Sequence, residues 1–309
     1  MSVMRKVLLA GSGNVWLREK AMRWGFVRRS VSTFMPGERA EDALEAAQVL
    51  KTKGVNTILT RLGESLAGAE DSQGVADHYV HVMDMVAERG LDAQISVKPT
   101  QLAYDQDKEM CFRHLTRLLD HAKLRNNIIW IDMESSEYVD GTIALFKRGR
   151  EYSDRIGIAI QAYLFRTEKD LEALVPFGCH IRMVKGAYLE PPAVAYPEKK
   201  DVDEAYFRHC ARLLQPDAIA AGTVLHIATH DMSLVERLRA VIRERKVPKS
   251  SYEFAMLFGI QRGAQQQLVA EGESLRVLIS YGEFWFPWYM RRLAERPANV
   301  WFVLKNLFS

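Results

Sequence analysis

The segment NIIWIDMESSEYVDGTIALFKRGREYSDRIGIAIQ (127–161) contains two apolar runs on either side of an amphipathic stretch. The runs NIIWID (127–132) and IGIAIQ (156–161) have the length and the β-branched content of buried strands. Between them, over 136–151, apolar residues recur at the spacing of a helix. The segment therefore predicts a strand, a helix and a second strand, which is the repeating unit of an α/β fold.

The same pattern recurs along the chain. Strands are predicted at VNTILT (55–60), AQISVK (93–98), NIIWID (127–132), IGIAIQ (156–161), HIRMVK (180–185), VLHIAT (224–229), YEFAMLF (252–258) and LRVLIS (275–280). Helices are predicted at 72–89, 105–124, 136–151, 167–175, 201–214, 231–244, 260–271 and 284–295. Eight such units predict a (β/α)8 barrel over residues 54–309, with residues 1–53 as a helical segment packed on it. A doubly wound sheet is the alternative, but the candidate dinucleotide motif GSGNVW (11–16) lacks its third glycine.

The composition of the chain limits the classes of protein to which it can belong. The chain has 309 residues, 48% hydrophobic and 26% charged, and a net charge of +3, too small to indicate a nucleic-acid partner. The three cysteines show no paired spacing, so we expect reduced thiols and a cytoplasmic protein. Basic and aromatic residues cluster over 5–34, which is compatible with peripheral contact with the inner face of a membrane. We favour packing of these aromatics on the body of the protein.

Polar residues follow most of the predicted strands, where barrel enzymes build their active sites. These residues are Thr60, Arg61, Glu64, Lys98, Asp132, Glu134, Gln161, Arg182, Lys185, Thr229, His230 and Asp231. Side chains of both charge signs on separate strands converge at one mouth of a barrel, which is hard to explain by stability alone. Lys98 and Asp132, on neighbouring strands, are expected to pair.

The segment YGEFWFPWYMRRLAE (281–295) predicts a final helix with a functional face. Pro287 suits the first turn of a helix. Beyond it, Trp288, Arg291 and Arg292 lie at i, i+3 and i+4 and share one face. Adjacent guanidiniums can pair bidentately with a small carboxylate, so we predict a carboxylate clamp here. The alternative is a solvated face of ion pairs.

The candidate site does not indicate a metal. The available ligands would be Glu134, His226, His230 and Asp231. His226 lies within an apolar strand, which is typical of a hydrogen-bonded core residue, and we predict no metal. The turn Gly186-Ala187 lets backbone N–H groups approach an anionic or heteroaromatic cofactor, and Arg182 beside it suits a flavin nitrogen. The residues by themselves indicate a barrel enzyme for a small carboxylate, with a flavin as one cofactor that fits.

Five motifs together resemble the proline dehydrogenase family. They are QAYLFRT (161–167), RMVKGAYLE (182–190), ATHD (228–231), FAMLFG (254–259) and YGEFWFPWYMRRLAERPAN (281–299). The resemblance extends over residues 55–299 and is to the monofunctional bacterial members, which are FAD-dependent. It implies a distorted (β/α)8 barrel that oxidises L-proline to Δ1-pyrroline-5-carboxylate by hydride transfer to FAD N5. It also implies that a membrane quinone receives the electrons, as the first step of proline catabolism.

The resemblance also implies roles for individual residues. Asp132 and Arg182 are implied to be catalytic, with Arg182 at the flavin N5. The residues implied to bind the cofactor are Met133, Gln161, Arg182, Lys185, Gly186, Ala187, Thr229 and His230. The residues implied to bind the substrate are Lys98, Tyr188, Leu257, Leu278, Trp288, Arg291 and Arg292. Glu64 matches an acidic residue that gates the site through an ion pair with Arg291.

The chain departs from the family at the wall of the substrate site. Leu278 and Trp288 stand where tyrosines are usual, and Ser280 stands where proline is common. We favour packing-compensated replacements, but hydroxyproline or another cyclic secondary amino acid stays open as the substrate. Two further alternatives are a flavin barrel enzyme resembling methylenetetrahydrofolate reductase and a catalytically idle flavin or amino-acid sensor.

Overall fold

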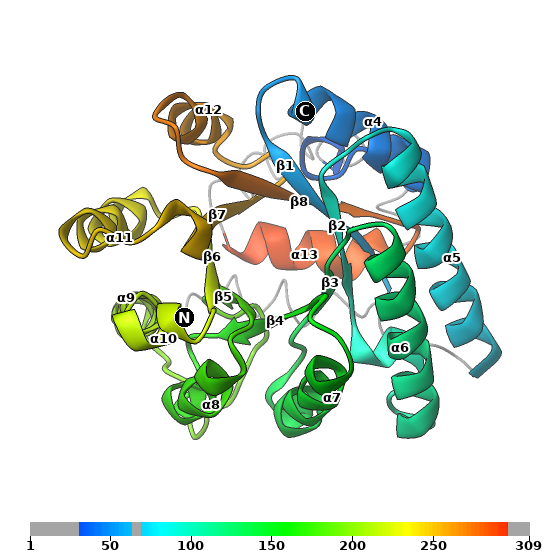
Figure 1. Ribbon diagram of the computed structural model, residues 1–309, viewed down its shortest axis with the longest axis horizontal. Helices are drawn as coiled ribbons and strands as arrows, with labels where there is room; N and C mark the ends of the chain where they lie inside the picture. The colour runs from blue at the N-terminus through cyan, green and yellow to red at the C-terminus, as the bar shows by residue number, and fades with distance from the viewer. Residues whose placement is uncertain (1–30, 64–68, 296–309) are drawn as a thin grey trace, which may run out of the picture.

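The computed structural model describes residues 31–63 and 69–295, without the side chains of residues 69, 70 and 291–295. Eight parallel strands close into a barrel in chain order, and β8 pairs with β1 (Figure 1). The strands are β1 (Asn56–Arg61), β2 (Ala93–Val97), β3 (Ile129–Ile131), β4 (Ile156–Gln161), β5 (His180–Val184), β6 (Val224–Ala228), β7 (Tyr252–Leu257) and β8 (Leu275–Tyr281). Each predicted strand is present, and the predicted (β/α)8 class is confirmed.

Helices surround the barrel at the predicted places. They are α5 (Ala69–Glu88), α6 (Lys108–Leu124), α7 (Val139–Tyr152), α8 (Thr167–Leu174), α9 (Lys199–Leu213), α11 (Met232–Glu244) and α12 (Arg262–Ala270). Short 3-10 turns occur at η1 (Pro99–Leu102), η2 (Ser136–Tyr138), η3 (Val175–Phe177) and η4 (Lys249–Ser251). The short helix α10 (Pro216–Ala220) was not predicted. Side-chain caps set two of the helix starts: Asp107 accepts from the N–H groups of the first turn of α6, and Asp231 does so for α11.

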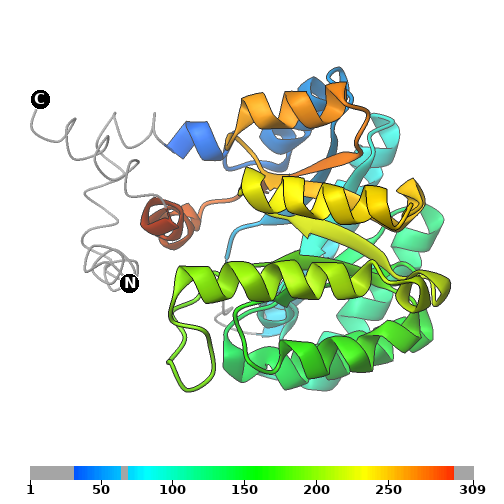
Figure 2. The same ribbon diagram turned by 90° about the vertical axis from the view of Figure 1, so that its left-hand side faces the viewer.

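The helix after β8 does not complete the outer ring. α13 (Trp285–Glu295) crosses the barrel opening in Figure 1 and lies beyond the strand ends in Figure 2, on the side where β8 leads into it. An earlier helix, α4 (Ala40–Lys51), packs on β1 and β8 and buries Ala43, Leu44 and Ala47. The barrel is thus distorted, because α4 covers the sector between β8 and β1 while α13 lies over the mouth.

A second apolar cluster holds α13. Its buried members are Val31, Met35, Leu62, Trp285, Phe286, Trp288 and Tyr289. Trp285 Nε1 also donates to Glu38 Oε1 at 3.0 Å. The position of α13 therefore depends on the segment before α4 and on the turn after β1, and its cluster is separate from the main core inside and around the barrel.

Arginine–carboxylate pairs join successive outer helices on the surface. These pairs are Arg125–Asp84, Arg148–Glu109, Arg166–Asp140, Arg212–Glu172, Arg237–Glu204 and Arg239–Glu271. The pairs range from half-exposed ones, such as Arg148–Glu109, to the more buried Arg239–Glu271, and ion pairs at a surface contribute little to stability. What these pairs share is their position, since each one links two neighbouring segments on the outside of the barrel.

The predicted helices within residues 1–30 lie outside the described residues. In the part of the chain that is described, no helix has both the length and the apolar character that crossing a membrane requires. All three cysteines are buried free thiols: Cys111, Cys179 and Cys210.

Candidate active site

Four polar side chains from β2, β3 and β5 meet at the carboxyl end of the barrel, and we call them the mouth cluster: Ser96, Lys98, Asp132 and Arg182. Lys98 Nζ lies 3.9 Å from Asp132 Oδ2, so the predicted pair is present. Ser96 Oγ donates to Asp132 Oδ1 at 2.8 Å. Arg182 forms an ion pair with Asp132, and its Nη2 also donates to Ser96 Oγ at 3.1 Å. One carboxylate is therefore shared by two cations and a hydroxyl.

Arg182 is the least satisfied member of the mouth cluster. It is only 4% exposed, and its Nη1 finds no hydrogen-bond acceptor among the described residues. Burial lowers the pKa of Arg182, and the Asp132 carboxylate opposes that shift. A buried donor without an acceptor costs roughly 1–3 kcal/mol, more when it is charged. Such an arrangement is stabilised when a bound molecule supplies the acceptor.

Trp130 of β3 forms a platform under the guanidinium. Arg182 Cζ lies 5.0 Å from the centre of the Trp130 ring, within cation–π range. Trp130 Nε1 donates to Gln94 Oε1 at 2.7 Å, which fixes the ring. A Cβ at position 157 would approach the ring to 2.7 Å, so Gly157 gives the indole its space. The hydrogen bond to Gln94 and the space left by Gly157 thus fix the ring on which Arg182 rests.

Gln161, at the end of β4, joins the turn after β3. Its Nε2 donates to the Glu134 carbonyl at 3.0 Å, while its Oε1 has no partner within the described residues. Glu134 Oε1 accepts from Thr100 Oγ1 at 2.8 Å, and Oε2 accepts from Thr100 N at 3.2 Å. The Glu134 carboxylate therefore ties the turn after β2 to that after β3, while Gln161 keeps an open acceptor.

The turn after β5 combines an anchored lysine with a tightly packed glycine. Lys185 Nζ lies 2.5 Å from Asp203 Oδ1 and 3.1 Å from Asp231 Oδ2. Gly186 has φ of +121°, and a Cβ there would come within 2.4 Å of the Tyr163 ring. A side chain at this position would clash with the Tyr163 ring, so packing requires glycine here, and the approach of its backbone N–H groups to a cofactor stays a prediction. Ala187 follows it and is partly exposed.

The ends of β6, β7 and β8 bring predicted cofactor and substrate residues together. Thr229 is buried and accepts from the backbone of Asp231 at 3.2 Å. His230 Nε2 accepts from Leu257 N at 3.4 Å. Leu257 is the register partner of Leu278 on β8, and both leucines are partly exposed. These two side chains form adjacent parts of an apolar wall.

For three further predicted residues, the structure shows the burial of the side chain. Met133 is buried directly after Asp132, and Tyr188 is partly exposed in the loop after β5. Trp288 is 9% exposed and belongs to the cluster that holds α13. The predicted gate residue and the two predicted clamp arginines have side chains outside the described residues: Glu64, Arg291 and Arg292.

A second polar group, the floor cluster, lies toward the amino ends of the strands, with the Asp92 side chain 56% exposed: Asp92, His180, His226, Glu253 and Arg276. Arg276 Nε donates to Glu253 Oε2 at 2.7 Å, and Nη1 donates to Asp92 Oδ1 at 2.8 Å. His226 is buried as predicted, but its Nδ1 lies 3.4 Å from Glu253 Oε2 without hydrogen-bond geometry. Across the described residues, no three His, Cys, Asp or Glu side chains gather as metal ligands would.

A family model described as Proline dehydrogenase matches residues 43–305. Proline dehydrogenase 1 of Bacillus subtilis subsp. natto is 33% identical over 307 residues, covering 99% of this chain and 100% of that protein. The chain belongs to the proline dehydrogenase family. Proline dehydrogenase of Deinococcus radiodurans is also 33% identical, over 93% of this chain and 91% of its own.

Solved structures of related fold extend the comparison. Proline utilization A (PutA) from Bdellovibrio bacteriovorus has a TM-score of 0.80 at 20% identity, over 94% of this chain and 36% of that chain. PutA from Bradyrhizobium japonicum has a TM-score of 0.70 at 19% identity, over 87% of this chain and 31% of that chain. These likenesses show a shared barrel fold, whereas the match in length is to the monofunctional proline dehydrogenases.

Two residues that organise the mouth of this family member were missed by the sequence analysis. Ser96 precedes Lys98 by two positions, so strand alternation places both on one side of β2 and could have revealed it. Gln101 accepts from Lys98 N at 3.3 Å and donates to the carbonyls of Arg61 and Gly63 at 2.9 and 2.8 Å. No sequence signal predicts this long-range link, which fixes the turn after β1 to the turn after β2.

Proposed function

We propose that this protein is an FAD-dependent dehydrogenase that oxidises L-proline to Δ1-pyrroline-5-carboxylate. The observation that carries the proposal is the mouth cluster. It contains a buried Arg182 with an unused donor, next to the pair of Lys98 and Asp132, in a barrel of the proline dehydrogenase family. A cation with a free donor suits a cofactor that gains negative charge on reduction.

The residues at the mouth fit a flavin. Arg182 Nη1 and Gln161 Oε1 are buried and lack partners among the described residues, so they offer one donor and one acceptor. A flavin ring carries matching acceptors and an N–H donor. We propose that the turn Gly186-Ala187 after β5 brings backbone N–H groups to the same cofactor. When bound, FAD would supply the hydride acceptor, for which side chains have no equivalent. The proposed contacts are Met133, Gln161, Arg182, Lys185, Gly186, Ala187, Thr229 and His230.

The charge of the mouth cluster supports an amine substrate bound in its neutral form. Lys98 and Arg182 share the single carboxylate of Asp132, so the cluster carries excess positive charge. Positive charge nearby disfavours protonation of an amine and attracts a carboxylate. The nitrogen of proline must be neutral when hydride leaves C5, because its lone pair forms the C=N bond. We therefore propose that Lys98 and Arg182 lower the pKa of the bound amine.

Orientation of a small ring requires contacts at both ends. We propose that Arg291 and Arg292 bind the substrate carboxylate, with Glu64 as the gate. Leu257, Leu278, Trp288 and Tyr188 would line the ring. Arg291→Met or Arg292→Met should raise KM for proline steeply while FAD stays bound. Unchanged proline kinetics in both variants would remove the clamp assignment.

The deciding experiment is an anaerobic titration of the flavin spectrum with proline. Bleaching of the bound flavin by proline supports the proposal, and a protein that takes up no FAD contradicts it. Reduction by NADH without reduction by proline would favour the reductase alternative. A flavoprotein that no cyclic amino acid reduces would favour the sensor.

A substrate panel addresses the second candidate function. Leu257 and Leu278 are register partners at the wall, so no hydroxyl stands at position 278 to bond a substituted ring. We expect kcat/KM to be highest for proline among proline, trans-4-hydroxyproline and pipecolate. A strong preference for either of the other two would assign the same chemistry to that substrate.

The electron acceptor and the location of the protein belong to the same proposal. We propose a membrane quinone as the acceptor and a cytoplasmic protein with peripheral contact at the inner face of the membrane. The support is the family resemblance. Reoxidation of the proline-reduced enzyme by a short-chain quinone faster than by oxygen would support the acceptor. Absence of binding to anionic lipid vesicles would contradict the membrane contact.

A further inference from the structure

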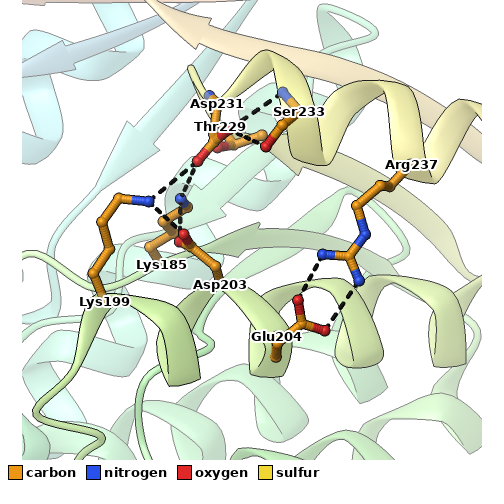
Figure 3. A network of polar contacts seen from close by, with 8 residues as sticks. All are labelled: Lys185, Lys199, Asp203, Glu204, Thr229, Asp231, Ser233 and Arg237. Carbon is orange, nitrogen blue, oxygen red and sulfur yellow. Dashed lines mark hydrogen bonds and ion pairs between the residues drawn. The ribbon is translucent and has the colours of Figure 1, made fainter.

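Two carboxylates hold Lys185 from two different helices (Figure 3). Asp203 lies on α9, and Asp231 caps the start of α11 directly after β6. Lys185 Nζ is 2.5 Å from Asp203 Oδ1 and 3.1 Å from Asp231 Oδ2. Lys199, at the start of α9, pairs with both carboxylates, 3.4 Å from Asp231 Oδ2. We call these four residues the rim latch: Lys185, Lys199, Asp203 and Asp231.

The rim latch is electrically balanced, with two ammonium groups and two carboxylates. Lys185 and both carboxylates are partly buried, their side chains 19–26% exposed, whereas Lys199 is 76% exposed. Although burial raises it, the pKa of Asp231 is held well below its ordinary value by Ser233 and Lys185. The Asp231 carboxylate is thus ionised at neutral pH and pairs with Lys185. Because the neighbouring charges of the latch balance the charge of Lys185, we expect this lysine to act more through its position than through its charge.

The latch joins the two loops that carry most of the proposed cofactor contacts. Lys185 begins the turn that continues through Gly186 and Ala187 after β5. Asp231 follows Thr229 and His230 after β6, and its own backbone N–H donates to Thr229 Oγ1 at 3.2 Å. One ion pair therefore fixes the ends of neighbouring strands relative to each other.

We infer that Asp203 and Asp231 are positioning residues that hold Lys185, and through it the turn after β5, in the geometry that binds FAD. This inference rests on the proposed function, since it assigns these residues to the FAD site of the same barrel. The carboxylates need no contact with the cofactor. Their action is to restrict a long, flexible side chain whose ordering would otherwise oppose binding.

A purely electrostatic role predicts the opposite result. Removing one carboxylate leaves the latch with a net charge of +1, which would attract the phosphates of FAD. Under that alternative, Asp203→Asn or Asp231→Asn tightens FAD binding and makes it more sensitive to salt. Under the positioning role, both substitutions weaken binding. The sign of the change in Kd therefore separates the two accounts.

The chain provides a matched control in the same two helices. Glu204 of α9 accepts a bidentate pair from Arg237 of α11 at 2.7 and 3.0 Å, beside the latch in Figure 3. This pair also bridges α9 and α11. Within the described residues, neither of its side chains forms a hydrogen bond or an ion pair with Lys185. Glu204→Gln therefore removes a comparable ion pair without touching the turn after β5.

The experiment measures the Kd of FAD for the apoprotein by quenching of flavin fluorescence, together with the Tm of the apoprotein. Asp203→Asn and Asp231→Asn are close in shape to the native residues, and asparagine still caps α11. We expect each to raise the Kd about tenfold, as loss of about 1.4 kcal/mol would. Glu204→Gln should leave the Kd within about twofold. All three should change the apoprotein Tm by similar small amounts.

A double-mutant cycle with Lys185→Met completes the test. If the carboxylates act through Lys185, Asp231→Asn should have little further effect on Kd in the Lys185→Met background. Equal effects in both backgrounds, an unchanged Kd or tighter binding would overturn the inference. A wild-type apoprotein that binds no FAD would instead overturn the proposed function, so the two failures are distinguishable.

Discussion

The floor and the mouth of the barrel are built from the same kinds of residue but are satisfied to different degrees. Arg276 at the floor is 5% exposed, and Arg182 at the mouth is 4% exposed. Every nitrogen of the Arg276 guanidinium donates: Nε to Glu253, Nη1 to Asp92 and the Thr57 carbonyl, and Nη2 to Asp92. Arg182 uses Nη2, while its Nη1 has no acceptor among the described residues.

The difference extends to the pKa of the two guanidiniums. Burial alone lowers the pKa of Arg276, but the Glu253 and Asp92 carboxylates outweigh it and the net shift is upward. Burial dominates at Arg182, where the shift is downward despite Asp132. Arg276, with all its donors paired, fits a structural role, whereas the open donor of Arg182 supports the role in ligand binding that we propose for it.

The largest expected effect is on stability, at the floor. Arg276→Met leaves Glu253 buried without its guanidinium, so we expect the free energy of unfolding to fall by about 3–5 kcal/mol. Urea denaturation of the apoprotein measures this change in the free energy of unfolding. The double variant Arg276→Met/Glu253→Gln should recover part of the loss, because no buried charge is left unpaired. A loss below about 1 kcal/mol in the single variant would contradict the structural role of the floor.

At the mouth the expected effect is on chemistry. Arg182→Met should lower kcat by about 10²–10³-fold, by analogy with removal of a donor to developing negative charge. It should also weaken FAD binding and shift the reduction potential of the flavin. Its stability should fall less than that of Arg276→Met, since Arg182 Nη1 has no acceptor among the described residues to lose. An unaltered flavin spectrum and potential would contradict the role of Arg182.

The sequence predicts the barrel more completely than it predicts these clusters. Apolar runs and helical spacing located all eight strands, and position at a strand end brought Lys98 to Asp132. The pairing of Arg182 with Asp132 joins residues 50 positions apart, on strands that are not neighbours. Such contacts depend on how the closed barrel staggers its strands, which periodicity does not specify. Periodicity also does not specify which strands a helix covers. The packing of α4 on β1 and β8, in the place of a final outer helix, could therefore not be predicted.

His180 at the floor should contribute to the pH dependence of stability, together with the other histidines whose pKa is lowered by burial: His78, His114, His209 and His226. Burial, with a contribution from Arg276, lowers the pKa of His180 from 6.5 to about 4. Above pH 6.5 the imidazole is neutral in both states. As the pH falls from there, the unfolded chain takes up a proton that the folded chain does not accept until about pH 4, so stability falls. At about pH 5.5 the loss is at most about 1.4 kcal/mol.

His180→Gln tests this origin of acid sensitivity. The variant should show a smaller difference in Tm between about pH 8 and about pH 5.5 than the wild type, even if its Tm is lower at both. Equal differences in the two proteins would show that other groups carry the acid sensitivity.

The smallest expected effect concerns the contact between the Arg182 guanidinium and the Trp130 ring. Trp130→Phe keeps an aromatic face under Arg182 but removes the N–H that Gln94 binds at 2.7 Å. A phenyl ring attracts a cation less than an indole does, so we expect a cost of about 0.5–1 kcal/mol, seen as a few-fold lower kcat and a small shift in flavin potential. Gln94→Leu is the control, because it frees the indole N–H and leaves the ring. If Gln94→Leu shifts the potential as much as Trp130→Phe, the tether and not the ring sets the position of Arg182. If neither variant shifts it, the contacts of Arg182 with Asp132 and Ser96 hold the guanidinium without help from the ring.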